Sequence, residues 1–256
     1  MSAQPTSGPF RIREPDPKYM TFVEHLQELR TRLTICVSTI AVGSVIGWFF
    51  AKRTIRLLDA PLRDAYASSH PGKTLPLFFN TVYGGFTLNL KVAIAIGFLI
   101  ALPVTIYEAW AFVAPAFGAR AGRWGPAIIT SSLVLFLAGV VTGYEVIPLA
   151  VKFFLGFETG DLQILPFASE YVSFVALILV VFGISFELPI VLVSLAALGI
   201  TSSRWLWSKR AHFFFGIFIF SMIVTPGADP ISPIVLGVIL YILYLGSVGV
   251  SRAIGK

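Results

Sequence analysis

The sequence predicts an all-α, polytopic membrane protein with six transmembrane helices and with its N-terminus and C-terminus inside. Hydrophobic residues make up 56% of the 256 residues and charged residues only 12%, and the mean hydropathy is +0.84. A soluble domain of this length is far more polar. The apolar runs are continuous and do not alternate with polar residues, which indicates helices and excludes an outer-membrane barrel.

Six apolar segments are expected to cross the membrane. Residues 1–18 predict a mobile cytoplasmic tail, followed by a single six-helix transmembrane domain at 19–256. A helix near residues 20–33 should lie at the interface and run into the first span. The fifth span has only 14 residues, ~21 Å as a helix against a hydrocarbon core of ~30 Å. The expected spans are near residues 33–51, 88–110, 127–148, 171–199, 211–224 and 234–250.

Basic residues determine the predicted orientation. With the N-terminus inside, the inner segments contain 12 of the 19 lysines and arginines, as the positive-inside rule requires. The outer exception is residues 52–85, a basic loop long enough to hold a helix of its own. These membrane flanks account for the net charge of +6, so no nucleic-acid partner is expected.

Few residues could support catalysis or metal binding. Cys36 is the single cysteine and lies in the first span, and the three histidines are scattered along the chain. The sequence has no phosphate-binding glycine loop and no nucleophile-elbow motif. We therefore expect no metal site and no cofactor, and a protein that is not an enzyme.

The fourth span carries a glutamate and a proline at membrane depth. Glu187 lies far from both ends of the apolar segment, where a charged side chain such as Asp costs about 2.5–3.5 kcal/mol. Pro189 has no N–H, so in a helix it leaves the carbonyl of Ser185 unpaired beside Glu187. We interpret Glu187, Ser185 and Pro189 as an intramembrane polar site that contacts a partner. The alternative is a packing residue that a neighbouring helix satisfies.

Four motifs together resemble the TatC family, the polytopic receptor subunit of the twin-arginine protein translocase. Their order and spacing extend the resemblance over the chain from about residue 20 onward. The last motif places Pro226 and Asp229 in the final outer turn. The motifs are His25-Leu-Gln-Glu-Leu-Arg-Thr-Arg32, Trp110-Ala-Phe-Val-Ala-Pro115, Phe182-Gly-Ile-Ser-Phe-Glu-Leu-Pro189 and Thr225-Pro-Gly-Ala-Asp229.

The resemblance implies a cupped arrangement of the six helices and a place in the plasma (inner) membrane of a prokaryote or an equivalent organelle membrane. It implies that folded cargo with an Arg-Arg signal peptide is recognised at the cytoplasmic face. It also implies TatA- and TatB-type single-span partners, a homo- or hetero-oligomer with TatC, and energy from the proton motive force.

The resemblance further implies that the motif before the first span binds the signal peptide. Glu28 matches the glutamate of this motif, and His25 and Arg30 belong to it. A carboxylate holds a guanidinium through bidentate hydrogen bonds that a neutral side chain cannot make. The alternative for Glu28 is an i,i+4 ion pair with Arg32, worth roughly a few tenths of a kcal/mol. The alternative for His25 is interfacial packing.

One departure from the family pattern leads to a further candidate. Family members commonly carry a glutamate where this chain has Ala121, so a second acidic contact for the signal is missing. Glu108, at the cytoplasmic end of the second span, is expected to replace it and to hold the signal together with Glu28. The alternative is a solvated carboxylate beside Arg120 or Arg123, a contact that contributes little.

Two other classes of function are compatible with single features of the sequence. A proton- or ion-coupled small-solute permease would use Glu187 as its coupling site, but it should show internal symmetry and paired broken helices, which we do not find. A structural scaffold for other membrane proteins would not need Glu187. The set of motifs therefore favours a translocase receptor.

Overall fold

The computed structural model describes residues 22–70, 75–157, 166–226 and 229–255, and the predicted tail at 1–18 lies outside them. Over these residues the chain is helical, with a single isolated bridge between Phe78 and Phe167. The elements are α1 (Phe22–Ser69), α2 (Gly84–Val113), η1 (Ala114–Arg120), α3 (Ala121–Leu155), α4 (Ala168–Ser185), α5 (Leu188–Ala197), α6 (Ser203–Ser208), α7 (Arg210–Val224) and α8 (Ile231–Ala253).

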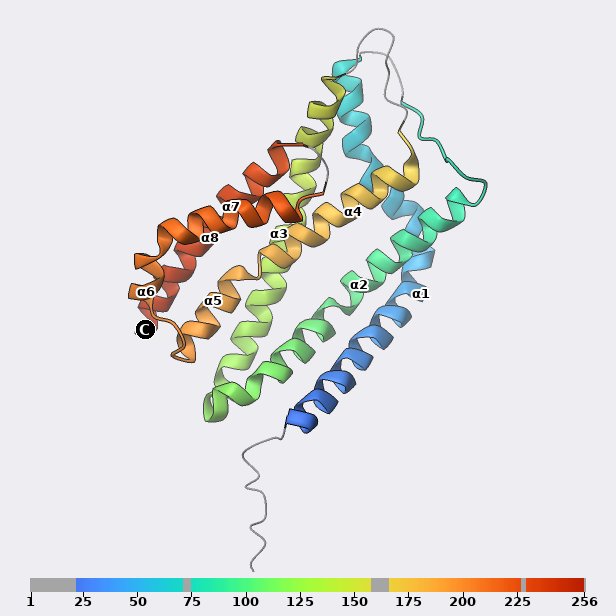
Figure 1. Cartoon of the computed structure of the whole chain (residues 1–256). Helices are drawn as coiled ribbons and strands as arrows, with labels where there is room; N and C mark the ends of the chain where they lie inside the picture. The colour runs from blue at the N-terminus through green and yellow to red at the C-terminus, as the bar shows by residue number, and fades with distance from the viewer. Residues whose placement is uncertain (1–21, 71–74, 158–165, 227–228, 256) are drawn as a thin grey trace, which may run out of the picture.

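The described helices agree with six spans. Five stretches are long and apolar enough to cross a membrane, with α4 and α5 counted as one, and α7 is a shorter apolar helix of 15 residues. In Figure 1 the start of α1, the junction of α2 with α3 and the end of α8 lie on one side of the molecule. The end of α1 and the start of α2 lie on the opposite side. We call the first side the inner side, because the basic residues predict that it faces the cytoplasm.

The first helix is longer than the sequence indicated. The expected interfacial helix, the first span and the helix within residues 52–85 form one continuous helix, α1, of 48 residues. Pro61 lies inside α1 and cannot pair with the carbonyl of Leu57. The hydroxyl of Tyr144, from α3, donates to that carbonyl at 2.7 Å. The helix therefore continues through the proline because another helix satisfies the freed acceptor.

The fourth span, by contrast, is interrupted. Residues 171–199 were expected to form one span, but α4 ends at Ser185 and α5 begins at Leu188. The N–H of Glu187 donates to the carbonyl of Ile184 at 3.0 Å, a tightened turn, and Pro189 occupies the first turn of α5. Proline is tolerated in a first turn because its missing N–H has no partner there.

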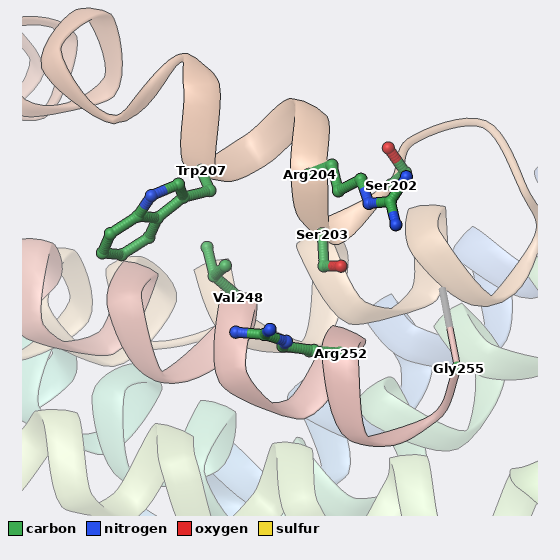
Figure 2. Close-up of a pocket in the computed structure, with 7 residues that line it drawn as sticks. All are labelled: Ser202, Ser203, Arg204, Trp207, Val248, Arg252 and Gly255. Carbon is green, nitrogen blue, oxygen red and sulfur yellow. The ribbon is translucent and has the colours of Figure 1, made fainter.

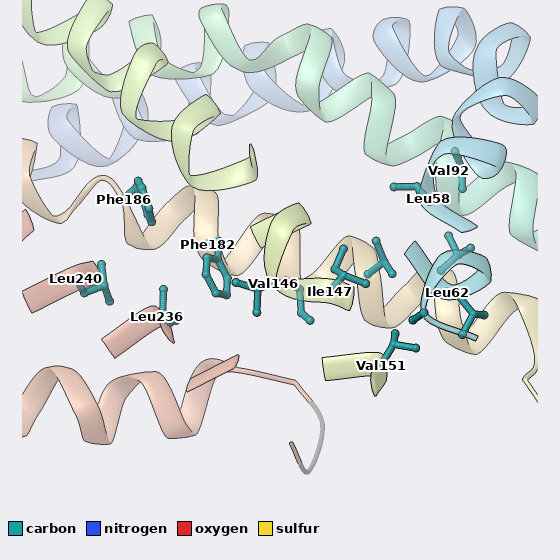
Figure 3. Close-up of a cluster of buried hydrophobic side chains, with 14 of the residues drawn as sticks. Leu58, Leu62, Val92, Val146, Ile147, Val151, Phe182, Phe186, Leu236 and Leu240 are labelled. Carbon is teal, nitrogen blue, oxygen red and sulfur yellow. The ribbon is translucent and has the colours of Figure 1, made fainter. Parts of the chain in front are cut away.

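The hydrophobic core extends across the whole bundle. It joins the outer part of α1, through Leu58 and Leu62, to α3, α4 and α8 (Figure 3). Phe182 and Ile147 are completely buried at its centre. The inner halves of α1 and α2 lie outside this cluster, and they are held by the contact between them and by the packing of Trp110 of α2 on Phe117 of η1.

Glycines bring α1 and α2 into backbone contact. A Cβ atom added at Gly43 would lie 2.8 Å from the carbonyl oxygen of Gly97, and one at Gly47 would lie 2.5 Å from that of Ala93. A Cβ atom at Gly97 would overlap the backbone of Ser44. The two helices can therefore cross this closely only with glycine at these positions.

This crossing gives the first testable prediction. Gly97→Val should lower the apparent melting temperature of the purified protein in detergent, because overpacking of this kind typically costs about 1–3 kcal/mol. The matched control is Gly246→Val in α8, a helical glycine whose added Cβ meets open space. Equal melting temperatures for the two variants would contradict the glycine-dependent crossing.

Candidate functional site

An arginine joins two carboxylates at the inner ends of α1 and α2. Arg32 Nε and Nη2 donate to Glu28 Oε1 at 3.0 and 2.6 Å, one helical turn away. Arg32 Nη1 donates to Glu108 Oε2 at 2.7 Å across the helix pair. The sequence placed Glu28 and Glu108 on the same side of the membrane, and the structure brings both of them to one arginine of the chain itself.

Burial strengthens this cluster beyond an ordinary surface ion pair. Glu108 is buried, and the side chains of Arg32 and Glu28 are 23% and 18% exposed. Glu108 is therefore not the solvated carboxylate of the alternative reading, and its partner is Arg32 rather than Arg123. The side chain of Arg120 lies outside the described residues. Partly desolvated, multiply hydrogen-bonded pairs are stronger than solvated ones because water screens them less.

The other two residues of the predicted signal site have different positions. The ring of His25 stacks on Phe112, with centroids 4.4 Å apart, and its Nδ1 lies 3.8 Å from Glu28 Oε2. His25 is thus a packing residue that also borders the cluster. Arg30 is exposed and lines a shallow hollow with Leu29 and other residues of α1. Residues two apart on a helix face different directions, so the structure does not bring Arg30 to Glu28.

The intramembrane candidate lies at the break between α4 and α5. Glu187 Oε2 accepts a hydrogen bond of 2.6 Å from the hydroxyl of Ser132 on α3. Glu187 Oε1 is buried and has no hydrogen-bond partner among the described residues. One oxygen is therefore satisfied by a neighbouring helix, as the packing interpretation requires, and the other is left for a further donor.

Glu187 borders a groove of about 660 Å³ between the α4–α5 break and α7. Ser185 lines this groove as well, whereas Pro189 does not belong to its lining. Most of the wall is apolar, and His212 is the other ionisable residue in it. The groove is lined by Ile184, Ser185, Glu187, Leu188, Val191, His212, Phe213, Gly216, Ile217, Phe220 and Leu240.

Glycines place Ser132 within reach of Glu187. A Cβ atom added at Gly139 would lie 2.6 Å from the carbonyl oxygen of Phe182, and one at Gly183 would lie 2.6 Å from the ring of Phe136. Sequence reasoning missed Ser132. The sequence feature that could have identified Ser132 is its spacing of seven residues from Gly139, which places both small residues on one face of α3.

The outer-turn residues have a structural role in the described chain. Asp229 is 4% exposed, and its Oδ1 accepts a 2.7 Å hydrogen bond from the backbone N–H of Ser232 in the first turn of α8. Asp229 therefore caps α8. Pro226 is half-buried, and residues 227–228 between the two lie outside the described chain. No group of histidine, cysteine and carboxylate side chains in the described ranges could hold a metal ion.

Comparison with known proteins gives a consistent result. A family model described as Sec-independent protein translocase protein (TatC) matches residues 24–238. The TatC protein of Deinococcus radiodurans is 35% identical over 230 residues, covering 90% of this chain and 84% of that relative. The corresponding protein of Frankia casuarinae is 32% identical over 240 residues, covering 91% of this chain and 66% of that relative.

A solved structure agrees with these sequence matches. The crystal structure of a twin arginine translocase receptor, TatC, superposes with a TM-score of 0.74 at 33% sequence identity. The match covers 91% of this chain and 100% of that one. The similarity therefore includes the helices that carry both candidate sites.

The contact between Ser132 and Glu187 gives the second prediction. Ser132→Ala leaves both carboxylate oxygens without a donor, and an unsatisfied buried polar group costs about 1–3 kcal/mol or more. We expect a lower apparent melting temperature in detergent. Ser131→Ala is the control, because Ser131 is the exposed neighbour on the same helix. A variant at Ser132 as stable as this control would show that the hydrogen bond contributes nothing.

Proposed function

Because the chain belongs to the TatC family, we propose that it is the subunit that recognises Arg-Arg signal peptides of folded cargo at the cytoplasmic face. At the level that the family establishes, it is a multi-pass inner-membrane subunit of the twin-arginine protein translocase and not an enzyme. Family membership also leaves the permease alternative without support. The signal site and the partner contacts described below are proposals.

The observation that carries the proposal is the position of Arg32. Its guanidinium lies between Glu28 and Glu108, with hydrogen bonds of 2.6 and 2.7 Å to carboxylates on two different helices. The two acids are therefore spaced to bind a guanidinium, which is the group that an Arg-Arg signal presents. Arg32 occupies the position that we assign to a signal arginine.

The two signal arginines meet one carboxylate oxygen that is unoccupied and one carboxylate that is already bound to Arg32. Glu28 Oε2 is buried and has no hydrogen-bond partner among the described residues. The first signal guanidinium binds there, beside the His25 ring that stacks on Phe112. The second takes the place of Arg32 on Glu108, while Arg32 keeps its hydrogen bonds to Glu28 Oε1 on its own helix. Because Glu108 exchanges one guanidinium for another, binding does not leave this buried carboxylate unpaired, which limits its desolvation cost.

We also propose that the groove at Glu187 receives the transmembrane helix of a TatA- or TatB-type partner. A single-span helix can offer a hydroxyl or amide to Glu187 Oε1 while its apolar side chains contact the groove wall. The groove opens beside Ile184 and Val191, which are 57% and 53% exposed. A partner approaching through the lipid therefore reaches the carboxylate without crossing water. The same proposal includes the proton motive force as the source of energy and a homo- or hetero-oligomer of this chain with TatC.

The third prediction tests the pair of acids. Glu108→Gln should weaken crosslinking of an Arg-Arg signal peptide nearly as much as Glu28→Gln. Each loses one charge-assisted hydrogen bond, worth about 1.5–3 kcal/mol or roughly ten- to a hundredfold in affinity. The matched control is Glu24→Gln, an exposed glutamate on the same helix as Glu28.

A second variant separates a direct contact from a general disturbance. Ala121→Glu, which restores the acid common in the family, should recover crosslinking in the Glu108→Gln background. Normal signal binding by Glu108→Gln alone would rule out Glu108 as the second contact.

The fourth prediction concerns Glu187. Glu187→Ala should abolish export of an Arg-Arg cargo while the protein stays inserted, and Glu187→Gln should keep part of the activity because an amide still forms hydrogen bonds. Glu145→Ala, which removes an exposed carboxylate from α3, is the control and should export normally. The measurement is the amount of cargo exported at matched expression. Full export by Glu187→Ala would remove the groove from the mechanism.

A further inference from the structure

A second hollow lies at the inner side, between α6 and the end of α8. It has a volume of about 810 Å³, and we call it the α6–α8 pocket. It belongs to neither site described above, since it shares no lining residue with the groove at Glu187 and contains neither Glu28 nor Glu108. The residues that line it are Ser202, Ser203, Arg204, Trp207, Val248, Arg252 and Gly255 (Figure 2).

Two arginines give this pocket a positive charge. Arg204 comes from α6 and Arg252 from the last turn of α8. Neither forms an ion pair with a carboxylate of the described residues. Among those residues, the acids on the inner side are Glu24, Glu28 and Glu108, and all three belong to α1 or α2. Paired arginines without carboxylate partners form a site for an anion with several oxygens, such as a phosphate.

The side chains are arranged to contact an extended ligand. In Figure 2 the Arg204 side chain extends toward Ser202, whereas the Arg252 guanidinium lies beside Val248, in the same part of the pocket as Trp207. Ser203 lies between them. The positive groups therefore face different parts of the hollow, and one of them adjoins an apolar and aromatic wall. A phosphodiester with an attached hydrocarbon part matches this arrangement better than a small inorganic anion does.

The pocket also lies at the depth where lipid head groups are found. Trp205 and Trp207 of α6 are 47% and 54% exposed, and exposed tryptophans mark the membrane–water interface. The apolar helices α7 and α8 continue from here into the membrane. Basic pockets between helices on the cytoplasmic side are typical sites for anionic lipid head groups.

We propose that the α6–α8 pocket binds the phosphate head group of an anionic phospholipid of the inner leaflet. Arg204 and Arg252 attract the phosphate from different parts of the hollow, the hydroxyls of Ser202 and Ser203 border it, and Trp207 and Val248 contact the apolar part next to the head group. An Arg-Arg signal peptide is excluded because its charge has the same sign as the pocket. The proposal does not depend on signal recognition, and its test measures lipid binding rather than export.

The fifth prediction tests this assignment with the full-length protein in neutral detergent. Native mass spectrometry should show a phosphatidylglycerol complex of the wild type that survives competition with phosphatidylcholine. The double variant Arg204→Gln/Arg252→Gln should bind phosphatidylglycerol about thirtyfold more weakly, since each basic residue near an anionic lipid contributes a factor of about five. The variant Arg204→Lys/Arg252→Lys keeps both charges and should retain most of the binding.

The matched control removes the same number of charges elsewhere. Arg53→Gln/Arg56→Gln deletes two exposed arginines of α1 at the opposite side and should bind the lipid like the wild type. Equal binding by the Arg204/Arg252 variant and the wild type would overturn the proposal. So would full displacement of the lipid by millimolar inorganic phosphate, because the pocket would then take a free anion. The proposal would also be overturned if the Arg204→Gln/Arg252→Gln variant lost a co-purified acidic protein but bound phosphatidylglycerol like the wild type.

Discussion

A carboxylate at the depth of the lipid tails needs a hydrogen-bond donor, and for Glu187 that donor is Ser132 on another helix. Much of the surrounding structure is needed for this one contact. Gly139 and Gly183 let α3 and α4 approach closely enough for a short hydroxyl to reach the acid. Pro189 ends the regular ladder of α4, so that the carboxylate lies at a break between helices rather than on a continuous helix surface. Packing and polarity are thus coupled here, because apolar helices without these small residues would leave the acid unsatisfied.

The cluster at the inner side follows the same rule with charged partners. The inner halves of α1 and α2 contribute little to the main core, and the contacts between them include the glycine crossing near Gly43 and Gly97, the stacking of His25 on Phe112 and the bridge from Arg32 to Glu108. Arg32 therefore has a structural function as well as the proposed one. It keeps two acids from two helices close together, an arrangement that their mutual repulsion would otherwise oppose. A site that is held ready by an internal guanidinium loses less conformational freedom when an external one arrives.

The sequence predicted the features that depend on local chemistry. Long apolar runs predicted the number of spans, the apolar segment of residues 211–224 predicted the short span α7, and the depth of Glu187 and the position of Pro189 marked the candidate polar site. Topology placed Glu28 and Glu108 on the same side of the membrane, but their contact with one arginine could not be derived from it. The features that the sequence could not supply depend on contacts between distant segments. The hydroxyl of Tyr144 that lets α1 pass through a proline is one of them, and it joins residues that lie 87 positions apart. Ser132, the donor to Glu187, is another, because its spacing from Gly139 marks one face of α3 but nothing local in the sequence pairs that face with Glu187.

The two ends of the inner side carry different sets of charges. The described acids of this side are on α1 and α2, where Arg30 and Arg32 also lie, whereas residues 203–210 and the end of α8 carry Arg204, Lys209, Arg210 and Arg252 and no acid. Arg210 is partly engaged, since it donates to the carbonyl of Trp207 and lies 4.8 Å from the centre of its ring. Arg204 and Arg252 line a pocket instead. The basic end repels a basic peptide, whereas the described acids lie at the end where we propose that the signal peptide binds. An anionic lipid in the α6–α8 pocket neutralises the basic end and reduces this contrast. The proposed lipid site and the proposed signal site are then coupled through the field of the inner surface, although they share no residue.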